Sequence, residues 1–391
     1  MRFPEFSGEW EMSSIGEQFE LYSGNTPSRM NKNQFDGSIN WITSGELKEH
    51  YISDTKEKIS EEAAKNNSLK LLPVGTFVIA IYGLEANGVR GTCSITTRES
   101  TISQACMAFT SKMDIQNEFL YSWYKKHGNI IGIKYAQGTK QQNLSYDIIE
   151  RFNISYPCME EQKKLIRFIS LIDQRIATQN KIIEKLQSLI KGLVDELMTV
   201  LLKGKLYPFS SFYIKAGEGG TPTTSVVEYY TEGTIPFIKI EDLSCKYLTN
   251  NKDFITELGM QKSSAWLIPS KSVIYSNGAT IGAISINEYP VCTKQGILGI
   301  VPNTNINVEY LYLLMSSSYF SKEISRIITE GTMKTVYLKD INHIKCPLPS
   351  MAQQKNITNL TSSIEEKLSI EQELLRFLNL QKQYLLHMIF I

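Results

Sequence analysis

The feature that most constrains the fold of this chain is an internal repeat. Gly-Asn-Thr-Pro at 24–27 returns as Gly-Gly-Thr-Pro at 219–222, and Ile-Asn-Trp-Ile at 39–42 returns as Ile-Pro-Phe-Ile at 235–238. More pairs follow in the same order, shifted by about 191 to 196 residues: Gln104 with Gln295, Glu118-Phe-Leu-Tyr121 with Glu309-Tyr-Leu-Tyr312, and Pro157-x-Met-x-x-Gln-Lys163 with Pro349-x-Met-x-x-Gln-Lys355. The 391 residues are therefore one unit of about 195 residues used twice, which excludes a single small module.

The first part of each copy has the pattern of a mixed α and β domain. Short β-type runs, such as 77–82 and 273–275, are separated by turn signals, and each copy has one amphipathic helix pattern. These helix patterns run from Asn117 to about Ile131 and from Val308 to about Ile328. We predict two α+β globular domains, at 1–157 and 206–349.

The second part of each copy has the pattern of one long helix. Pro157 and Pro349 are each followed by about 40 residues without another proline, a residue that the interior of a helix does not tolerate. We predict long helices at 158–205 and 350–391.

Both helices carry the seam of a coiled coil, in which apolar residues recur at alternating steps of four and three. In the first copy the seam positions are Leu165, Ile169, Ile172, Ile176, Gln179, Ile183, Leu186, Ile190, Leu193 and Leu197. In the second copy they are Ile357, Thr361, Ile364, Leu368, Glu371, Leu375, Leu378, Lys382, Leu385 and Ile389.

The polar residues Gln179 and Glu371 occupy equivalent seam positions, so pairing of the helices would give each a hydrogen-bond partner. This holds for parallel and antiparallel pairs, and connectivity decides between them. The segment 203–205 leads directly into the second globular domain without a return linker, which favours an antiparallel coiled coil with pseudo-twofold symmetry. A helix of about 40 residues spans roughly 60 Å and could act as a ruler. The alternative is two unrelated amphipathic helices, each lying on its own domain.

The sequence has no motif for metal, nucleotide or covalent chemistry. Its six cysteines and four histidines are scattered, without C-x-x-C or H-E-x-x-H spacing, and there is no phosphate-binding loop, dinucleotide loop or G-x-S-x-G turn. We therefore predict a non-catalytic chain that binds no metal and no cofactor directly. We also expect a cytoplasmic protein without a membrane segment, because no apolar run reaches the ~18 residues of a membrane helix and no secretory signal is visible.

Several motifs together resemble the specificity subunit of Type I restriction-modification enzymes. They are the domain openings at 24–27 and 219–222 with the strands after them, Gly278-Ala-Thr-Ile-Gly282, Gly138-Thr-Lys-Gln-Gln-Asn-Leu144, Gly331-Thr-Met-Lys-Thr335, and the helix start Pro157-Cys-Met-Glu-Glu-Gln162. The resemblance covers essentially the whole chain. The second copy departs from the pattern at Ala352-Gln353-Gln354, where the family usually has Glu-Gln.

The resemblance implies a role in choosing DNA sequences. Each globular domain would be a target recognition domain that reads one half of a bipartite, asymmetric site in double-stranded DNA, and the coiled coil would set the unread spacer. The helices would dock two modification subunits, which use S-adenosylmethionine for methylation. Restriction subunits would add ATP- and magnesium-dependent translocation and cleavage. The alternatives are a specificity module for a different methyltransferase or nuclease effector, and a coiled-coil adaptor that binds no DNA.

The balanced charge of the chain bears on how it would bind DNA. Lys and Arg number 41 and Asp and Glu number 40, so the formal net charge is only +1. Because neutralisation of phosphates supplies most non-specific affinity for DNA, we expect weak binding by the chain alone and tight binding only with modification subunits.

Residues that read bases should differ between the copies if the two domains read different half-sites. The loops after Gly138 and Gly331 differ in this way, and Gln or Asn can pair with adenine and Lys with guanine. An ordinary solvated turn is the alternative for these loops. We predict that the DNA-reading residues are Lys140, Gln141, Gln142, Asn143, Met333, Lys334 and Thr335, together with Tyr82, Tyr275 and Asn277.

Overall fold

The computed structural model describes residues 2–112, 114–328 and 335–390. It divides into two compact units: unit 1 is made of residues 1–179 and 374–391, and unit 2 of residues 180–373. Each unit includes a globular part and a stretch of both long helices.

The globular part of unit 1 is built on a five-stranded sheet in the order β2-β9-β6-β7-β4. A three-stranded sheet, β5-β3-β8, and a two-stranded sheet, β1-β10, complete it. The strands are β1 (Glu11–Ser14), β2 (Phe19–Ser23), β3 (Ile39–Ile42), β4 (Tyr51–Ile52), β5 (Lys58–Ile59), β6 (Phe77–Ala80), β7 (Cys93–Thr96), β8 (Ser100–Ile102), β9 (Cys106–Ser111) and β10 (Asn153–Tyr156). The helices are α1 (Ile15–Gln18), α2 (Glu61–Asn66), α3 (Asn117–Tyr135) and α4 (Tyr146–Glu150), with 3-10 turns at Lys32–Phe35 and Ser44–Glu46.

Unit 2 repeats the three sheets in the same order, as β12-β19-β16-β17-β14, β15-β13-β18 and β11-β20. The strands are β11 (Leu206–Pro208), β12 (Tyr213–Glu218), β13 (Ile235–Ile238), β14 (Tyr247–Leu248), β15 (Asp253–Ile255), β16 (Val273–Ser276), β17 (Ile284–Asn287), β18 (Cys292–Thr293), β19 (Ile297–Pro302) and β20 (Lys345–Pro347). The helices are α6 (Glu257–Gln261), α7 (Val308–Ser316), α8 (Ser318–Ile327) and α9 (Leu338–Ile341), with 3-10 turns at Phe209–Ser211, Val227–Tyr229 and Ile240–Asp242. The equivalent strand pairs also share their directions, because β3 with β8 and β13 with β18 are both parallel.

The amphipathic helix of each copy packs on the large sheet, α3 on β6, β7 and β9 and α7 on β16 and β17. The prediction of a single helix in the second copy is wrong, because Ser317 separates α7 from α8. Ser317 has extended backbone angles, and its hydroxyl accepts the N–H of Phe320, which caps the start of α8.

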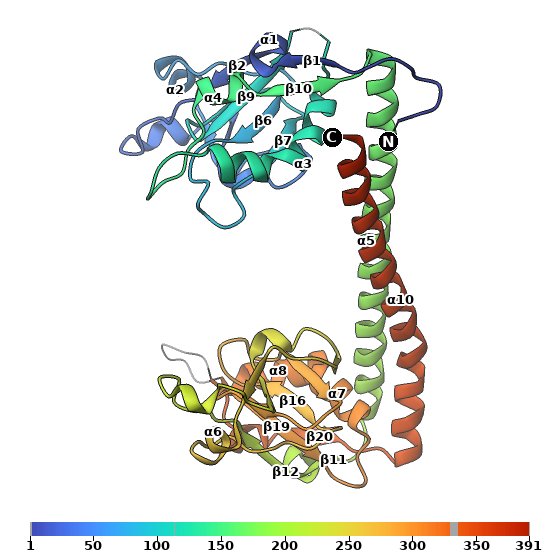
Figure 1. Cartoon of the computed structure of the whole chain (residues 1–391). Coiled ribbons are helices and arrows are strands. Elements are labelled where there is room, and N and C mark those ends of the chain that lie inside the picture. The colour runs from blue at the N-terminus through green and yellow to red at the C-terminus, as the bar shows by residue number, and fades with distance from the viewer. Residues whose placement is uncertain (1, 113, 329–334, 391) are drawn as a thin grey trace. The chain divides into compact units, whose positions relative to one another are not determined.

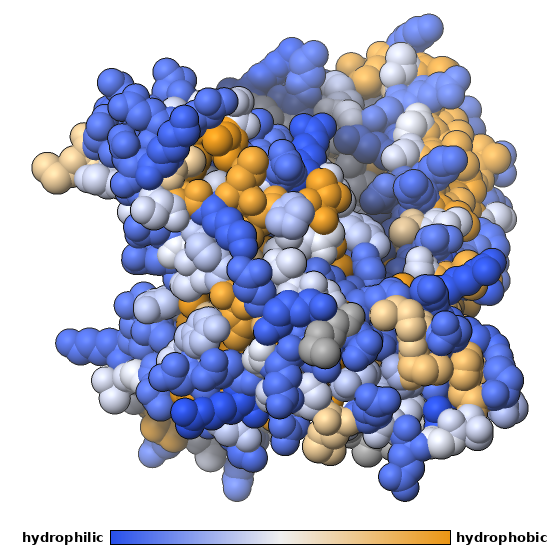
Figure 2. Space-filling model, turned by 90° about the horizontal axis from the view of Figure 1, so that it is seen from above, coloured by the Kyte–Doolittle hydropathy of each residue, from blue (hydrophilic) through white to orange (hydrophobic). Residues whose placement is uncertain are grey.

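The two long helices are α5 (Met159–Leu201) and α10 (Met351–Ile389), and both begin close after the predicted prolines. In each unit a segment of α5 and a segment of α10 lie side by side and run in opposite directions (Figure 1). Hydrophilic residues cover most of the face shown in Figure 2, and hydrophobic residues appear there in smaller areas between them. That surface agrees with the ordinary composition of the chain, in which 42% of residues are hydrophobic and 21% are charged.

Candidate nucleic-acid interface

The start of each long helix is tied to its globular part by a buried glutamine. The Gln162 Nε2 donates to the carbonyls of Asp114 (2.6 Å) and Pro157 (2.9 Å), and its Oε1 accepts the N–H of Gln116 at 3.1 Å. Gln354 makes the equivalent three bonds, to Asn305, Pro349 and Asn307. Both glutamines are 0% exposed. This is the physical reason for the glutamine of the helix-start motif: it satisfies backbone groups of the loop before α3 or α7 and so orients the helix.

The residue before this glutamine differs between the copies for a local reason. Glu161 is buried and pairs with Arg2 at 2.7 Å, which joins the N-terminal segment to α5. Gln353, its counterpart, is exposed, and its Oε1 accepts the N–H of Ser350 at 3.0 Å. The departure from the family pattern is therefore an exchange of an ion pair for a helix cap.

The predicted seam is the least exposed face of both helices, since every one of its positions is buried or half-buried. In unit 1, Leu165 and Ile169 of α5 share a core with Leu385 and Ile389 of α10. Lys382 also contacts Asp173 across the pair. In unit 2, Ile357 of α10 shares a core with the end of α5. The antiparallel direction is therefore confirmed within each unit.

Two details of the seam were not expected. At the end of α5 the fully buried residues are Val194 and Met198, while Leu193 and Leu197 are half-buried. The end of α5 turns this face toward the core of the globular part of unit 2. Leu386 and Phe390, at the end of α10, pack in the same way into the core of the globular part of unit 1. Gln179 and Glu371 are 5% and 7% exposed, and their mutual contact stays a prediction.

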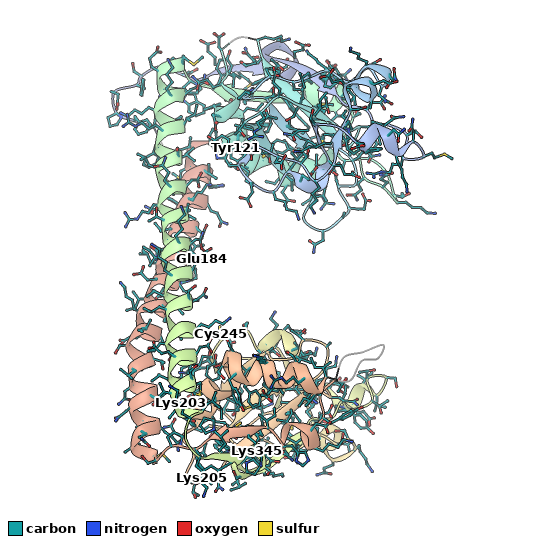
Figure 3. All side chains as sticks on the ribbon, turned by 180° about the vertical axis from the view of Figure 1, so that it is seen from behind. Tyr121, Glu184, Lys203, Lys205, Cys245 and Lys345 are labelled. Carbon is teal, nitrogen blue, oxygen red and sulfur yellow. The ribbon has the colours of Figure 1, made fainter. Side chains whose placement is uncertain are left out.

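A polar cluster joins the globular part of unit 2 to α10, the long helix that follows it in the sequence. In unit 2, Lys246 lies between Glu309 at 2.5 Å and Glu365 of α10 at 2.6 Å, with its Nζ 5.5 Å from the centre of the Tyr312 ring. Cys245, the neighbour of Lys246, lies on the side of the globular part next to α5 (Figure 3). We call this group the unit 2 junction.

The equivalent cluster in the globular part of unit 1 has histidine in place of lysine. His50 stacks between Tyr51 (4.1 Å) and Tyr121 (3.9 Å) and contacts Glu118 at 2.9 Å. Burial and the hydrogen bond to Glu118 raise the pKa of Tyr51 to about 12. Tyr121 is on the side of the globular part that faces the helices (Figure 3). The sequence analysis missed both clusters, although the repeat places His50 opposite Lys246 and Glu118 opposite Glu309.

The predicted DNA-reading residues of unit 1 lie together at one set of loops. Lys140 and Gln141 are exposed at the tip of a hairpin that closes where Gln137 and Asn143 exchange backbone hydrogen bonds of 2.8 and 2.9 Å. Tyr82 is 38% exposed at the start of the neighbouring loop. Gln142 and Asn143 are half-buried, and the Asn143 Oδ1 is buried.

In unit 2 the structure contradicts two of the predicted readers. Tyr275 is 1% exposed and packs at 6.2 Å from Phe320 in the core, and burial raises the pKa of its hydroxyl. Asn277 is also 1% exposed, and it exchanges hydrogen bonds of 3.0 Å with the backbone of Val336. Both residues hold the sheet together and cannot reach a base without unpacking it.

The remaining residues predicted in unit 2 belong to the loop before α9. Met333 and Lys334 lie outside the described residues. Thr335 is half-buried at the foot of that loop, next to Val336.

The two globular parts differ in the length of the loop after the central strand. Ile81 and Asn277 are equivalent, because each accepts a backbone hydrogen bond from the end of the second loop, from Leu144 and Val336 respectively. From these positions to the next strand there are 11 residues in unit 1 (82–92) and 6 in unit 2 (278–283), a difference of 5. The same scaffold thus carries different loops, as two different half-sites would require.

Comparison with known families settles what the duplicated scaffold is. The model of the Type I restriction modification DNA specificity domain matches twice, at residues 7–188 and 212–379. The chain belongs to this family of DNA specificity domains. The resemblance drawn from the helix-start and loop motifs is therefore confirmed, as is the fold of two α+β repeats with long helices.

The specificity-domain chain also matches curated relatives over most of its length. It is 24% identical over 384 residues to the Type I restriction enzyme MjaIX specificity subunit of Methanocaldococcus jannaschii, covering 92% of this chain and 88% of that protein. It is 25% identical over 294 residues to the EcoR124I/EcoR124II specificity subunit of Escherichia coli, covering 68% of each.

Solved structures share the fold of this specificity chain. The S subunit of a Type I restriction-modification system from M. genitalium aligns with a TM-score of 0.54 at 16% identity, over 100% of this chain and 99% of that one. A chain from a study of complex assembly and conformational transition of the type I R-M system aligns with a TM-score of 0.61 at 14% identity, over 98% of both.

The described residues contain neither a membrane-spanning helix nor a cluster of metal-binding side chains. Over 2–112, 114–328 and 335–390, no helix combines the length and apolar character needed to cross a membrane. Within the same ranges, no three His, Cys, Asp or Glu side chains gather into a group that could hold a metal ion.

Proposed function

We propose that this chain is the subunit that selects the DNA sequence in a Type I restriction-modification complex. Each globular part would read one half of a bipartite target, and the long helices would set the length of the unread spacer. The observation that carries the proposal is the duplicated scaffold with unequal loops, in a chain of the DNA specificity family. At ~1.5 Å per residue, the 43 residues of α5 give a helix of roughly 60 Å.

The proposal includes docking of two modification subunits on the paired helices. In unit 1 an open apolar groove runs between α5 and α10, lined by Phe168, Leu171, Ile172, Arg175, Leu374, Phe377, Leu378 and Gln381. Leu171 and Phe377 are 54% and 52% exposed there, which is unusual on a helix pair that already buries a seam. Three equivalent positions of unit 2 hold Ile182, Leu189 and Leu360, which are also exposed. Two similar apolar surfaces support docking of two copies of one partner.

The chemistry would come from the partners. Modification subunits would bring S-adenosylmethionine and methylate the site, and restriction subunits would bring ATP and magnesium for translocation and cleavage. This chain would act without a catalytic residue, in the cytoplasm where the DNA is. The family supports this division, because its model describes a DNA specificity domain rather than a methyltransferase or a nuclease.

The test is methylation sequencing of cells that express the full chain together with the modification subunit encoded in the same genome. We expect one methylated motif of two short half-sites with a constant unread spacer, and we expect it to disappear when this chain is omitted. A methylation pattern that does not depend on the chain would refute the proposal. Cleavage or methylation directed by a different co-purifying enzyme would favour a specificity module for another effector.

A coiled-coil adaptor without DNA binding is the second candidate. A mobility-shift experiment with the assembled complex separates the two functions, since an adaptor would not change which duplex is retained. The unequal loops on equal scaffolds favour the specificity subunit, because an adaptor needs no loop diversity.

A further inference from the structure

The two loops of unit 1 that hold the exposed candidate residues are joined into one body by Gln142. Its carbonyl accepts the N–H of Leu84 at 3.0 Å, and its own N–H donates to the Glu85 Oε2 at 2.7 Å. The Arg90 Nη2 donates to the Gln142 Oε1 at 2.6 Å. Leu84, Glu85 and Arg90 all belong to loop 82–91. Main-chain and side-chain atoms of Gln142 are therefore used to bind this neighbouring loop.

Arg90 is braced against the rigid part of the domain. Its side chain lies on Gly132 of α3 so closely that a Cβ at Gly132 would come within 2.5 Å of the Arg90 Cγ. Gly91, with φ of +72°, brings the end of the loop against the backbone of Asn129, where a Cβ would lie 2.8 Å from the amide nitrogen. Loop 82–91 is thus held on α3, and through Arg90 it holds Gln142.

The hairpin tip, unlike Gln142, is free to contact bases. Recognition of adenine by glutamine needs both the side-chain oxygen and the side-chain nitrogen. The oxygen of Gln142 is already engaged by Arg90. Lys140 and Gln141 are exposed at the tip. Gly138, at φ of +113°, permits the tight turn, because a Cβ there would lie 2.0 Å from the carbonyl oxygen of Gln141.

Among the described loops, the contacts of Gln142 with Glu85 and Arg90 are found in unit 1 alone. Glu85 and Arg90 both fall in the stretch 82–92, which is 11 residues long, whereas the equivalent stretch 278–283 of unit 2 has 6. The longer loop of unit 1 therefore carries both groups that hold Gln142.

We propose that Glu85, Arg90 and Gln142 form a clamp that determines specificity in unit 1. The clamp positions the hairpin tip so that Gln141 contacts an adenine and Lys140 a guanine in one half-site, and Gln142 is a positioning residue that reads no base. This inference rests on the proposed function, and it assigns Gln142 a positioning role in place of the base contact predicted from the sequence.

The test compares two neighbouring substitutions in the full chain, assembled with its modification subunits. Gln142→Glu keeps an acceptor for Arg90 but removes the donor that adenine recognition needs. Gln141→Glu removes the same donor at the tip and is the matched variant. Methylation sequencing and duplex-binding competition are the readouts, with thermal unfolding to confirm that each variant is folded.

We expect Gln141→Glu to lose preference for one adenine of one half-site by roughly 5- to 150-fold, the range for a lost bidentate contact. We expect Gln142→Glu to keep the motif within about twofold. Arg90→Ala should relax that same half-site and leave the other unchanged, and Arg90→Lys should restore part of the preference because its ammonium can still donate to Gln142.

Two outcomes would overturn the clamp: an equal change of motif in both glutamate variants, or an unchanged motif in both. A wild-type complex that methylates no bipartite motif would instead contradict the proposed function, so the two failures are distinguishable.

Discussion

The buried glutamines at the helix starts show how much one side chain can organise. Gln162 makes three hydrogen bonds to backbone groups, of which the bond to Pro157 is buried and the other two are partly buried. Replacing it with alanine leaves them unpaired, and we expect a loss of about 3 kcal/mol in the free energy of unfolding of unit 1. Urea unfolding measures this loss. Lys163→Ala, at the exposed next position, is the control and should cost less than about 0.5 kcal/mol. Equal effects of the two variants would contradict the role of Gln162.

A second residue makes unit 1 sensitive to acid. His127 stacks on Trp123 with ring centres 4.8 Å apart, and its Nε2 is buried. Burial, helped by the charge of Lys126, lowers the pKa of His127 to about 4. As the pH falls, His127 is therefore protonated at a higher pH in the unfolded chain than in the folded chain. The free energy of unfolding decreases as the pH falls from about 6.5 toward 4.

His127→Phe keeps the stacked ring and removes the titration. Between pH 7.5 and 5.0 we expect the variant to lose about 1 kcal/mol less unfolding free energy than the wild type, because solvent screens part of the effect at a half-buried ring. Urea titrations followed by tryptophan fluorescence measure this difference, since Trp123 lies in the affected unit. Parallel pH curves for the two proteins would exclude His127 as the cause.

The wrong predictions at Tyr275 and Asn277 show that burial could be inferred from the sequence, whereas the contact of Gln142 with Arg90 could not. The repeat places Tyr275 opposite Ile79 and Asn277 opposite Ile81, and both counterparts are apolar and buried. That comparison could have revealed the burial of both residues. The engagement of Gln142 was different, because nothing in the spacing of Arg90 and Gln142 predicts that 52 residues of chain fold back to join them.

At the level of elements, the unit 2 junction is a three-charge group that holds a globular part to α10. Lys246, Glu309 and Glu365 have side chains only 16%, 24% and 20% exposed. Lys246→Met keeps the length of the side chain but leaves two carboxylates facing each other, and we expect a loss of about 2 kcal/mol. Glu365→Gln should cost less, because Lys246 keeps Glu309 as its partner. Thermal unfolding of both variants tests whether Lys246→Met is more destabilising than Glu365→Gln. A purely steric role of Lys246 would not produce this difference.

The apolar groove between the helices can be tested in the same way. Leu171→Asp puts a charge on a surface that is exposed in the free chain, so its stability should change little. We expect binding of the modification subunit to weaken by about tenfold or more, as for a central contact of an interface. Gln174→Asp, exposed on the same helix, is the control. Titration calorimetry that finds the same affinity for both variants would place the docking surface elsewhere.

Elements were predicted better than residues because their signals are long. Heptad spacing over about 40 residues defined the seam. The structure departs from it at Val194 and Met198 and again at Leu386 and Phe390, where the end of each helix meets a globular part. The break at Ser317 was missed because a single capping serine interrupts a continuous amphipathic pattern.

For the whole molecule, the near-zero net charge leads to a prediction about DNA binding. With 41 basic and 40 acidic residues, the chain can neutralise few phosphates. We expect the isolated chain to bind its target weakly, with a loss of affinity between 50 and 200 mM salt, and the complex with modification subunits to bind tightly. Fluorescence anisotropy on a duplex with the methylated motif measures both. Nanomolar specific binding by the isolated chain at physiological salt would contradict this view.

The end of α10 has a consequence for how the protein is made. Leu386 and Phe390 complete the core of unit 1, where Phe390 meets Phe119 at 5.2 Å, whereas unit 2 is one continuous stretch of chain. During synthesis, residues 180–373 can pack against one another as soon as they have been made. Residues 1–179 lack part of their core until residues 374–391 have been made. The unit translated first therefore cannot complete its core until the end of α10 has been made, and we expect its apolar surface to be open to aggregation until then.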